Sequence, residues 1–509
     1  MDFQAHVLKI IMIPLLGSLM IPVLGWLGKR KATGYLSVAL LGTTHVMTWF
    51  LLQPALNGEM FTRSFPIWGP INFTITLDAL AAFMCFASSL LALLIAIYSL
   101  GYIEHTENEP EYYFIVTLFL GAMMGLVFSG NLIILYLFWE ISALACWRLI
   151  GYYREADYIW KADKAFLVTF GGAVLMLFGF ILLFAQYGTF EIAQLAGKEI
   201  GGLALFLILC GIFSKSASFP LHTWLPDAGV APSTITSLLH AAILVKIGLY
   251  GFARMFLMGM KISDQLQTAV LVLALVSAFV SACAALMETN IKRLLAYSTV
   301  SQIGYTFLGL AAFSRDGYVG AILYILAHGL AKGGLFLCAG IIEHGTHTKD
   351  MTKMGGLLKK MPVTAVCYLI CALSIAGIPP MAGFFCKWFV ISGLLESGHQ
   401  YVALFAILTA VITLLYMLKS FHYMFLGKPR SDREAHHEGT PVMVGVVTVL
   451  ASLTIVTSVL LQFPYRLAKK ADLERLALRK PACTAPVVAG TVKPLVHVET
   501  RGEEMTPCK

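Results

Sequence analysis

Seven titratable side chains stand inside long apolar runs, where a charged group is costly. A charge at the centre of a bilayer costs at least ~2.5–3.5 kcal/mol on insertion scales, so each such residue needs a reason. Burial and a nearby carboxylate act in opposite directions on the protonation of a lysine, so a lysine held between the two can exchange a proton near neutral pH. One acid cannot close ion pairs with four lysines, which favours ion conduction over a set of structural pairs. The seven residues are Glu140, Lys215, His240, Lys246, His328, Lys332 and Lys387.

The two histidines are on the same predicted helices as two of the lysines. His328 and Lys332 are four residues apart, so they would share one helix face about one turn from each other. His240 and Lys246 are six apart and would point about 120° apart on a regular helix. They could line one path only on a distorted helix or through bridging water. Four other polar side chains near the ends of apolar runs are expected to reach the membrane interface: Asp78, Arg148, Lys419 and His422.

The composition requires a membrane protein. Of the 509 residues, 58% are hydrophobic and 13% are charged, and the mean hydropathy is +0.80. A soluble domain has about 45–50% apolar and about 25% charged residues, so a water-soluble enzyme is excluded. The formal net charge of +8 fits the basic cytoplasmic loops of membrane proteins. No basic run with interleaved aromatic residues indicates a nucleic-acid partner.

The apolar stretches predict an all-α polytopic fold of about 14 membrane spans, at roughly 20 residues per crossing. The first of them, 5–27, is expected to be a retained helix rather than a removed signal peptide. The polar, basic tail over 464–509 contains no span. The candidate spans are 5–27, 34–52, 75–100, 112–129, 131–150, 162–186, 203–219, 233–253, 265–287, 298–312, 318–342, 362–396, 401–425 and 441–463.

The distribution of Lys and Arg between alternating loops predicts the orientation. One set of loops holds about three times as many as the other, and such an excess marks the cytoplasmic side. This places the N-terminus outside a prokaryotic cell membrane. The basic tail would then be outside as well, so either it is an amphipathic helix on the outer surface or the span count is off by one. The smaller set comprises Arg63, Lys198, Arg254, Lys261 and Arg315.

Two apolar runs are interrupted by proline close to one of the lysines. Lys215 precedes Pro220 in SKSASFPLHTWLPDA, and Lys387 follows Pro379 and Pro380 in SIAGIPPMAGFFCKWF. Proline frees backbone carbonyls, which are tolerated at membrane depth only where protein or water satisfies them. Matching broken segments in the two halves of a transporter mark its working site. The two breaks therefore predict where ions pass.

The sequence carries no motif for other catalytic chemistry. It has no GxxxxGK[ST] phosphate loop, no GxGxxG fingerprint and no GxSxG elbow. Its ten cysteines form no CxxC or Cys/His cluster. We therefore expect no cofactor, no metal, and no redox or hydrolytic centre in the chain itself. Any enzyme activity would belong to a complex of which the chain is a subunit.

Five blocks of sequence resemble the antiporter-like membrane subunits of respiratory complex I, multisubunit sodium/proton antiporters and membrane-bound energy-converting hydrogenases. The longest is SKSASFPLHTWLPDAGVAPSTITSLLHAAILVKIGLYGFAR, and the others are NLIILYLFWEISAL, ETNIKRLLAYSTVSQIGY, HGLAKGGLFL and GIPPMAGFFCKWF. The resemblance implies about 14 helices with two inverted five-helix repeats. The implied units are 1–111 with helices 1–3, 112–258 and 259–427 as the repeats, 428–463 with a loop and helix 14, and the tail 464–509.

The same resemblance implies roles for the seven residues. Glu140 matches the acid of the family's fifth helix, and Lys215 matches the lysine of its broken seventh helix. His240 and Lys246 match two alternative positions of the eighth helix. Lys332 matches the central lysine of the eleventh helix, with His328 one turn before it, and Lys387 matches the basic residue of the broken twelfth helix. One position departs from the pattern, since Ala173 stands where the distal complex I subunit has an acid. The sequence GIPPMAGFFCKW is closer to the antiporter-complex and hydrogenase branches of the family than to complex I itself.

Together these features predict a proton- or sodium-translocating subunit of a redox-driven membrane complex. Ions would enter by one half-channel, cross a hydrated Lys/His/Glu axis, and leave by another, with Glu140 paired to Lys215. The implied partners are other membrane subunits, including related antiporter-like ones, a peripheral redox module and lipid. Two alternatives stay open: a free-standing secondary cation/proton antiporter, and a mainly structural subunit whose charges are frozen ion pairs.

Overall fold

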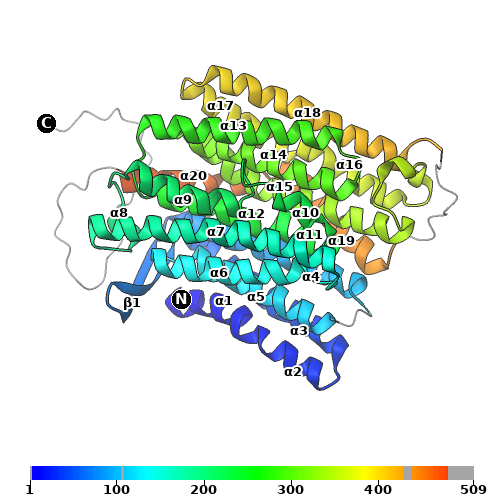
Figure 1. Cartoon of the computed structure of the whole chain (residues 1–509), viewed down its shortest axis with the longest axis horizontal. Helices are drawn as coiled ribbons and strands as arrows, with labels where there is room; N and C mark the ends of the chain where they lie inside the picture. The colour runs from blue at the N-terminus through cyan, green and yellow to red at the C-terminus, as the bar shows by residue number, and fades with distance from the viewer. Residues whose placement is uncertain (1–2, 105–107, 429–437, 480–509) are drawn as a thin grey trace.

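Helices form nearly all of the computed structural model, which describes residues 3–104, 108–428 and 438–479. Most of them run roughly along the long axis of the molecule (Figure 1). Eleven helical segments among these residues are long and apolar enough to cross a membrane. The chain is an all-α polytopic membrane protein, as its composition predicts, with one short β-hairpin added.

The hairpin precedes the third predicted span. Its two antiparallel strands pair Phe61 with Leu77, and the predicted span at 75–100 begins too early because β2 extends to Leu77. The next residue, Asp78, accepts a hydrogen bond from Ala81 N at 2.8 Å and so caps the following helix. The elements of this part are α1 (Phe3–Ser18), α2 (Met20–Trp26), α3 (Arg30–Asn57), β1 (Phe61–Trp68), β2 (Ile71–Leu77) and α4 (Ala79–Tyr102).

The next part of the chain contains an interrupted helix and a distorted one. Helix α9 ends at Lys215, and a non-helical stretch that includes Pro220 follows it. The segment from Ser233 to Leu257 is helical except for a bend at Ile243, and it includes two π-helical turns, η2 and η3. The elements are α5 (Glu109–Val127), α6 (Leu132–Ile150), α7 (Ala156–Tyr187), α8 (Ile192–Leu195), α9 (Gly202–Lys215), α10 (Trp224–Asp227), η1 (Ala228–Val230), α11 (Ser233–Ser237), η2 (Leu238–Ala242), α12 (Leu244–Phe252) and η3 (Ala253–Leu257).

A second interruption divides the predicted span 362–396. Gly377, in the left-handed region at φ 81°, ends one half-helix, and the next begins after Pro379 and Pro380. The elements here are α13 (Asp264–Met287), α14 (Ile291–Ala311), α15 (Arg315–Thr346), η4 (Met351–Lys353), η5 (Leu357–Lys359), α16 (Pro362–Ala376), α17 (Ala382–Glu396) and α18 (Gln400–Phe425).

The C-terminal part contains two helices where one was predicted. Helix α19 spans Pro441–Val459, and a further helix, α20, spans Gln462–Arg479. Helix α20 lies mostly in the polar, basic segment for which an amphipathic surface helix is one of the two predicted alternatives, and it packs against α4, α15 and α3. Residues 429–437 of the preceding loop and 480–509 of the predicted tail are outside the described residues.

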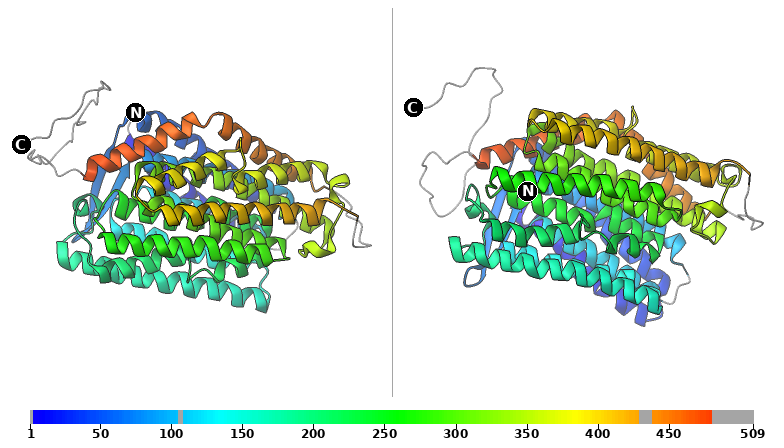
Figure 2. Two further views of the ribbon diagram at one scale, coloured as in Figure 1. Left: turned by 90° about the horizontal axis from the view of Figure 1, so that it is seen from above. Right: turned by 45° about the horizontal axis from the view of Figure 1, so that its top comes forward.

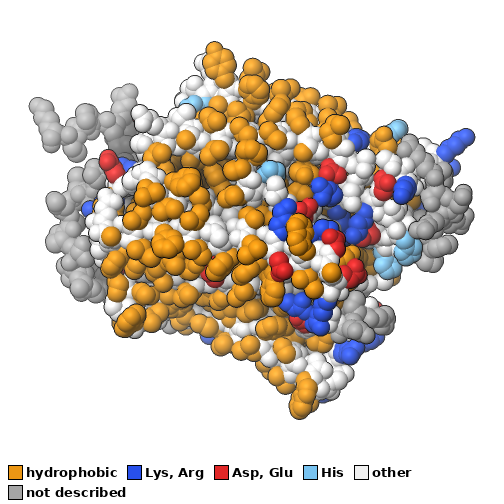
Figure 3. Space-filling model, viewed as in Figure 1, with side chains coloured by type: hydrophobic (Ala, Val, Ile, Leu, Met, Phe, Trp, Pro, Cys, Tyr) orange, Lys and Arg blue, Asp and Glu red, His pale blue; other side chains and the backbone are white. Residues whose placement is uncertain are grey.

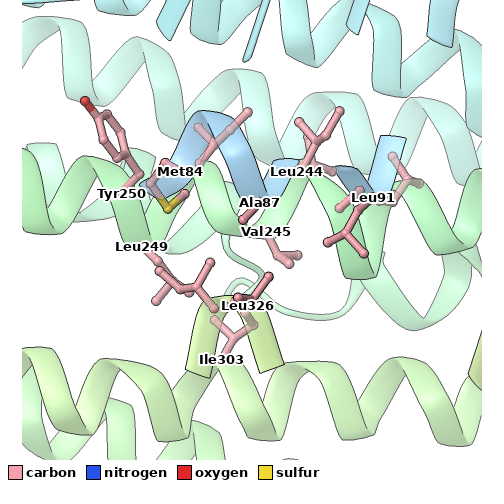
Figure 4. Close-up of a cluster of buried hydrophobic side chains, with 14 of the residues drawn as sticks. Met84, Ala87, Leu91, Leu244, Val245, Leu249, Tyr250, Ile303 and Leu326 are labelled. Carbon is pink, nitrogen blue, oxygen red and sulfur yellow. The ribbon is translucent and has the colours of Figure 1, made fainter. Parts of the chain in front are cut away.

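Two segments form the centre of the bundle. The apolar windows of Ser233–Leu257 and of α15 are entirely buried, whereas those of the peripheral α1–α2, α18 and α19 are one-third buried. Side chains from α4, α12, α14 and α15, among them Met84, Leu249 and Leu326, fill the space beside these segments (Figure 4). The charged residues predicted for the ion path on these two helices are therefore surrounded by protein.

The outside of the bundle is suited to lipid. Hydrophobic side chains cover most of the face in Figure 3, and charged side chains gather toward one end of it. The other views show the helices lying side by side along the same direction (Figure 2). The three predicted spans that fall short of a full apolar crossing are the short α9, the polar-rich α14 and the divided 362–396 segment.

Candidate functional site

The seven predicted residues come from six elements that meet around the buried centre. Glu140 is on α6, Lys215 is the last residue of α9, and Lys387 is in the first half of α17. The other four are on the two wholly buried segments: His240 in η2, Lys246 in α12, and His328 and Lys332 in α15.

All but one of these side chains are removed from solvent. Glu140 is half-buried, on a face of α6 where Leu137 and Leu144 are exposed. The others are at most 4% exposed: Lys215, His240, Lys246, His328, Lys332 and Lys387. Lysine is almost never fully buried without a partner, so the partners of these four lysines define the chemistry of the site.

Each of the four lysines donates to a backbone carbonyl rather than to a carboxylate. Lys215 Nζ donates to Trp139 O at 3.0 Å, and Lys332 Nζ donates to Leu295 O at 2.9 Å. Within the part of the chain that the structure describes, none of the four forms an ion pair. A neutral carbonyl accepts a hydrogen bond from an ammonium group but brings no negative charge, so these lysines lack the counter-ion that a structural ion pair would supply.

The broken twelfth-helix segment supplies the acceptors for Lys387. Its Nζ donates to Ile375 O at 2.8 Å and to Ala376 O at 3.3 Å. Both carbonyls belong to the last turn of α16, where a helix leaves its carbonyls without intrahelical partners and carries partial negative charge. The interruption before Pro379 therefore creates a binding site for an ammonium group.

A π-helical turn supplies the carbonyl acceptors for Lys246. In η2 the amide of Ile243 donates to Leu238 O, five residues back, instead of four. Lys246 Nζ donates to His240 O at 2.9 Å and also to Ala241 O. The helix between His240 and Lys246 is thus distorted, which is the condition under which the two residues could line one path.

The two central histidines have no hydrogen-bond partner. Both ring nitrogens of His240 and both of His328 are buried and unpaired among the described residues. His240 packs on Phe336 with ring centroids 4.5 Å apart, and His328 meets Tyr324 edge-on at 5.9 Å. Buried polar atoms are normally satisfied by protein or ordered water, so these imidazoles mark the places where water or a proton would bind.

The central cations are close enough to influence one another. His328 interacts electrostatically with Lys246, Lys332, Lys387 and His240. Repulsion between like charges rises as one group takes up a proton, so protonating one member promotes proton loss from its neighbours. The arrangement can transmit charge along a row of amines and imidazoles.

The predicted ion pair between Glu140 and Lys215 does not form in the structure. The Lys215 amine bonds instead to the carbonyl of the adjacent Trp139 and lies over its ring, 5.8 Å from the centroid. Glu140 Oε1 has no hydrogen-bond partner among the described residues, although the two charges interact at longer range. Glu140 lies on the face of α6 that also carries the exposed Leu137 and Leu144, whereas Trp139, whose carbonyl accepts from Lys215, is fully buried.

Sequence reasoning missed a polar group at one end of the central helices. Lys292 is 1% exposed rather than in an open loop, and its Nζ lies 2.6 Å from Glu343 Oε2 and 3.0 Å from Ala231 O. Ser233 Oγ donates to the same Glu343 oxygen at 3.3 Å. Ser233, Ser237 and His240 are spaced four and three residues apart, so they share one face, and Ser237 Oγ is buried without a partner. This spacing was readable in the sequence.

Two residues predicted at the membrane boundary are also buried. Asp78 was expected to reach the interface and Arg254 to lie in a loop, but their side chains are 4% and 6% exposed and form an ion pair. Arg254 Nη2 donates to Asp78 Oδ1 at 3.0 Å, and its Nε donates to Tyr250 OH at 2.7 Å. Their partners are distant in sequence, so neither run of residues indicates the pair.

Family models match most of the central chain. The model described as NADH:quinone oxidoreductase/Mrp antiporter, transmembrane, matches residues 129–413. The model of the N-terminus of chain 5 of NADH-ubiquinone oxidoreductase (complex I) matches residues 69–113. The first match runs from just before α6 into α18 and includes all seven predicted residues, and the second covers β2, α4 and the start of α5.

Individual relatives agree with the family models. The chain is 32% identical over 482 residues to Na(+)/H(+) antiporter subunit A1 of Staphylococcus haemolyticus, and 32% identical over 484 residues to the subunit A1 of Staphylococcus aureus. The alignments cover 88% of this chain and 60% of each relative. The chain thus spans about three-fifths of the length of these relatives.

Two solved structures have the same fold. A chain of the Mrp complex from Dietzia sp. DQ12-45-1b superposes with a TM-score of 0.86 at 23% identity, covering 95% of this chain and 98% of that one. A chain of the membrane-bound sulfane sulfur reductase, an archaeal respiratory membrane complex, gives 0.84 at 22%, covering 93% and 98%. With more than half of its length matched by the family model, the chain belongs to the family of transmembrane subunits shared by NADH:quinone oxidoreductase and Mrp antiporters.

Proposed function

We propose that this chain translocates protons as one subunit of a multi-subunit membrane complex. The observation that carries the proposal is a row of three buried lysines held by carbonyls, Lys246, Lys332 and Lys387, which interact with two histidines that are unpaired among the described residues. Lys215, the fourth buried lysine, is held by a carbonyl in the same way and interacts with Glu140. A structural role would be met by closed ion pairs, which other charged residues of this chain do form. The row lacks them.

The proton route follows from the order of the groups. The Glu343–Ser233–Ser237 face leads from one end of the bundle to His240, and from there the row continues through Lys246, His328 and Lys332 to Lys387. Each transfer breaks an N–H bond on one group and forms one on the next, directly or through a water molecule. Repulsion among the cations drives the charge along the row.

The surface charges support the orientation predicted from the sequence. Several ion pairs gather at the end of the bundle that holds the α6–α7 and α13–α14 boundaries, including Arg154–Glu111 and Lys349–Glu343. We propose that this basic end faces the cytoplasm, that the N-terminus lies outside, and that the membrane is a prokaryotic cell membrane.

Exposed apolar faces support contacts of this chain with lipid or with other membrane subunits. Leu137 and Leu144 flank Glu140 on α6 and are each 52% exposed in the single chain. Lipid or a neighbouring membrane subunit would cover such a face. We propose other membrane subunits, including related antiporter-like ones, as partners, with a peripheral redox module supplying the driving force.

A second candidate is antiport driven by a sodium gradient. The observation that favours it is the 32% identity to sodium/proton antiporter subunits. In that case the same row carries protons against sodium, and no redox module is needed.

One experiment separates these functions. The tagged chain is purified with its copurifying subunits, reconstituted into vesicles, and followed with a luminal pH dye. A pH change that needs the electron donor of a copurifying redox subunit supports the redox-driven pump, and one that needs only a sodium gradient supports antiport. A chain that purifies alone and is active is a free-standing antiporter, and a complex that moves no protons under either drive contradicts the proposal.

Glu140→Gln is expected to slow proton translocation about tenfold, with assembly intact. Glutamine keeps the volume of the side chain but removes the negative charge that acts on Lys215 at a distance. One pKa unit of coupling corresponds to a tenfold change in protonation. The measurement is the rate of luminal pH change, with Glu155→Gln, an exposed residue before α7, as the matched control. A variant as fast as the wild type would exclude this role of Glu140.

A further inference from the structure

Helix α20 carries buried chemistry that the translocation row does not use. It lies at the end of the bundle that also holds the β-hairpin (Figure 1) and packs on α4, α15 and α3. The helix is polar, yet Asp472, Glu474 and Arg475 are 0%, 5% and 2% exposed. A solvated amphipathic helix would turn such residues outward, so the inward charges of α20 need partners.

Two of the three buried charges, Asp472 and Arg475, pair with each other. Arg475 Nη2 lies 2.6 Å from Asp472 Oδ1, Arg315 Nε lies 3.6 Å from Asp472 Oδ2, and the Arg475 guanidinium covers the Tyr318 ring at 4.9 Å. Glu474 is different. It forms no ion pair with a described residue, and its Oε1 is buried without a hydrogen-bond partner.

Glu474 shares the N-terminus of α4 with a second carboxyl group. Its Oε2 accepts a hydrogen bond from Ala79 N at 2.9 Å, while Asp78 accepts from Ala81 N at 2.8 Å. Asp78 is already occupied by Arg254. Glu474 therefore sits beside a carboxylate whose counter-ion is fully engaged.

Burial and the neighbouring Asp78 raise the pKa of Glu474 to about 8. Arg254 of η3 and Lys470 of α20 oppose the shift. Arg315, Asp316 and Tyr318 of α15, with Asp472 and Arg475, are the other charged or titratable groups at this docking surface. A carboxyl group in this position is protonated at neutral pH and ionises within a physiological range.

One helix face connects Glu474 with the central row. Lys246, Tyr250 and Arg254 are four residues apart, so they lie on one side of the segment Ser233–Leu257, about 6 Å apart along it. Tyr250 OH accepts from Arg254 Nε at 2.7 Å, and Arg254 contacts Asp78. The face starts at Lys246 and ends beside the Glu474 carboxyl group, whose Oε1 is unpaired among the described residues.

We propose that Glu474 is the proton-exchange group at the outer end of this face. Its carboxylate Oε1 takes one proton from a hydrated proton on the Lys246 side, so that an O–H bond of the water breaks as the carboxyl O–H bond forms, while Arg254 keeps its own protons. The reverse exchange releases the proton to water at the outer surface. The hydrogen bond from Ala79 N holds Oε2 in both states, which leaves Oε1 to exchange. This inference rests on the proposed proton translocation and adds an outer terminus to it.

The test uses the whole reconstituted complex. Glu474→Gln is expected to lower translocation about tenfold or more and to abolish the part of the rate–pH profile with a midpoint near pH 8, while Glu474→Asp keeps that midpoint. Glu396→Gln, an exposed residue at the end of α17, is the matched control. The carbonyl-stretch infrared difference between acidic and alkaline samples should lose one protonated-carboxyl band in Glu474→Gln only.

The outcomes separate this inference from the proposed function. If Lys332→Met blocks translocation while Glu474→Gln leaves the rate and pH profile unchanged, the row conducts and Glu474 is not its terminus. If the infrared band persists in Glu474→Gln, the group is not protonated and the inference fails. If Glu474→Gln does not assemble, the wild-type and Glu474→Asp spectra and pH profiles still decide it.

Discussion

Replacing Lys332 by methionine is expected to reduce proton translocation roughly 10²-fold or more while the complex still assembles. Lys332 is fully buried on α15 and interacts electrostatically with Lys246 and Lys387. Methionine fills the same apolar space but can neither accept nor donate a proton. A positioned proton-transfer group contributes about 10²–10⁴-fold.

The matched control for this variant is Lys419→Met. Lys419 also sits in an apolar helix and also donates to backbone carbonyls, Leu286 O at 2.7 Å and Glu288 O at 3.1 Å, but it is half-buried on the peripheral α18. We expect wild-type translocation from it in the same vesicle assay. Equal rates in Lys332→Met and the wild type, or an equal loss in Lys419→Met, would remove the row from the mechanism.

The residues of the row could be predicted from the sequence because a lysine inside an apolar run is rarely tolerated without a reason. The backbone carbonyls that accept hydrogen bonds from these lysines could not be predicted. Lys215 bonds to a carbonyl 76 residues away, and the carbonyls that hold Lys387 exist only because α16 ends where it does. Proline predicts that carbonyls are freed, and only the packing determines which amine they receive.

The buried charges around the N-terminus of α4 could not be predicted for a related reason. Asp78 and Arg254 are 176 residues apart, and Ala79 and Glu474 are 395 apart. Each residue taken alone is at the boundary of an apolar run or in a polar tail, where a solvated side chain is the usual outcome. Only the docking of α20 on α4 brings them together, and no local pattern encodes that contact.

The combined variant Asp78→Asn/Glu474→Gln is expected to destabilise the protein by about 3–5 kcal/mol, the usual cost of leaving one partner of a buried ion pair uncompensated. Arg254 is 6% exposed on its side chain and is paired with Asp78. A guanidinium does not lose its proton in proteins, so it cannot escape the cost by becoming neutral. In Asp78→Asn alone, Glu474 can ionise beside Arg254 and recover part of the loss.

Thermal unfolding in detergent, followed by a thiol-reactive dye, measures this effect because six described cysteines are buried and free: Cys85, Cys146, Cys338, Cys367, Cys371 and Cys386. Glu474→Gln alone should melt near the wild type, since its neutral amide replaces a carboxyl group that is protonated at neutral pH. Adding Arg254→Gln to the combined variant should raise the midpoint again, because no unpaired charge remains. Breaking the partly exposed Lys161–Asp157 pair should change the midpoint little. If the combined variant unfolds at the same temperature as the wild type, the buried Asp78–Arg254 pair does not stabilise the contact between α20 and α4. Apolar contacts then fix α20 in its place.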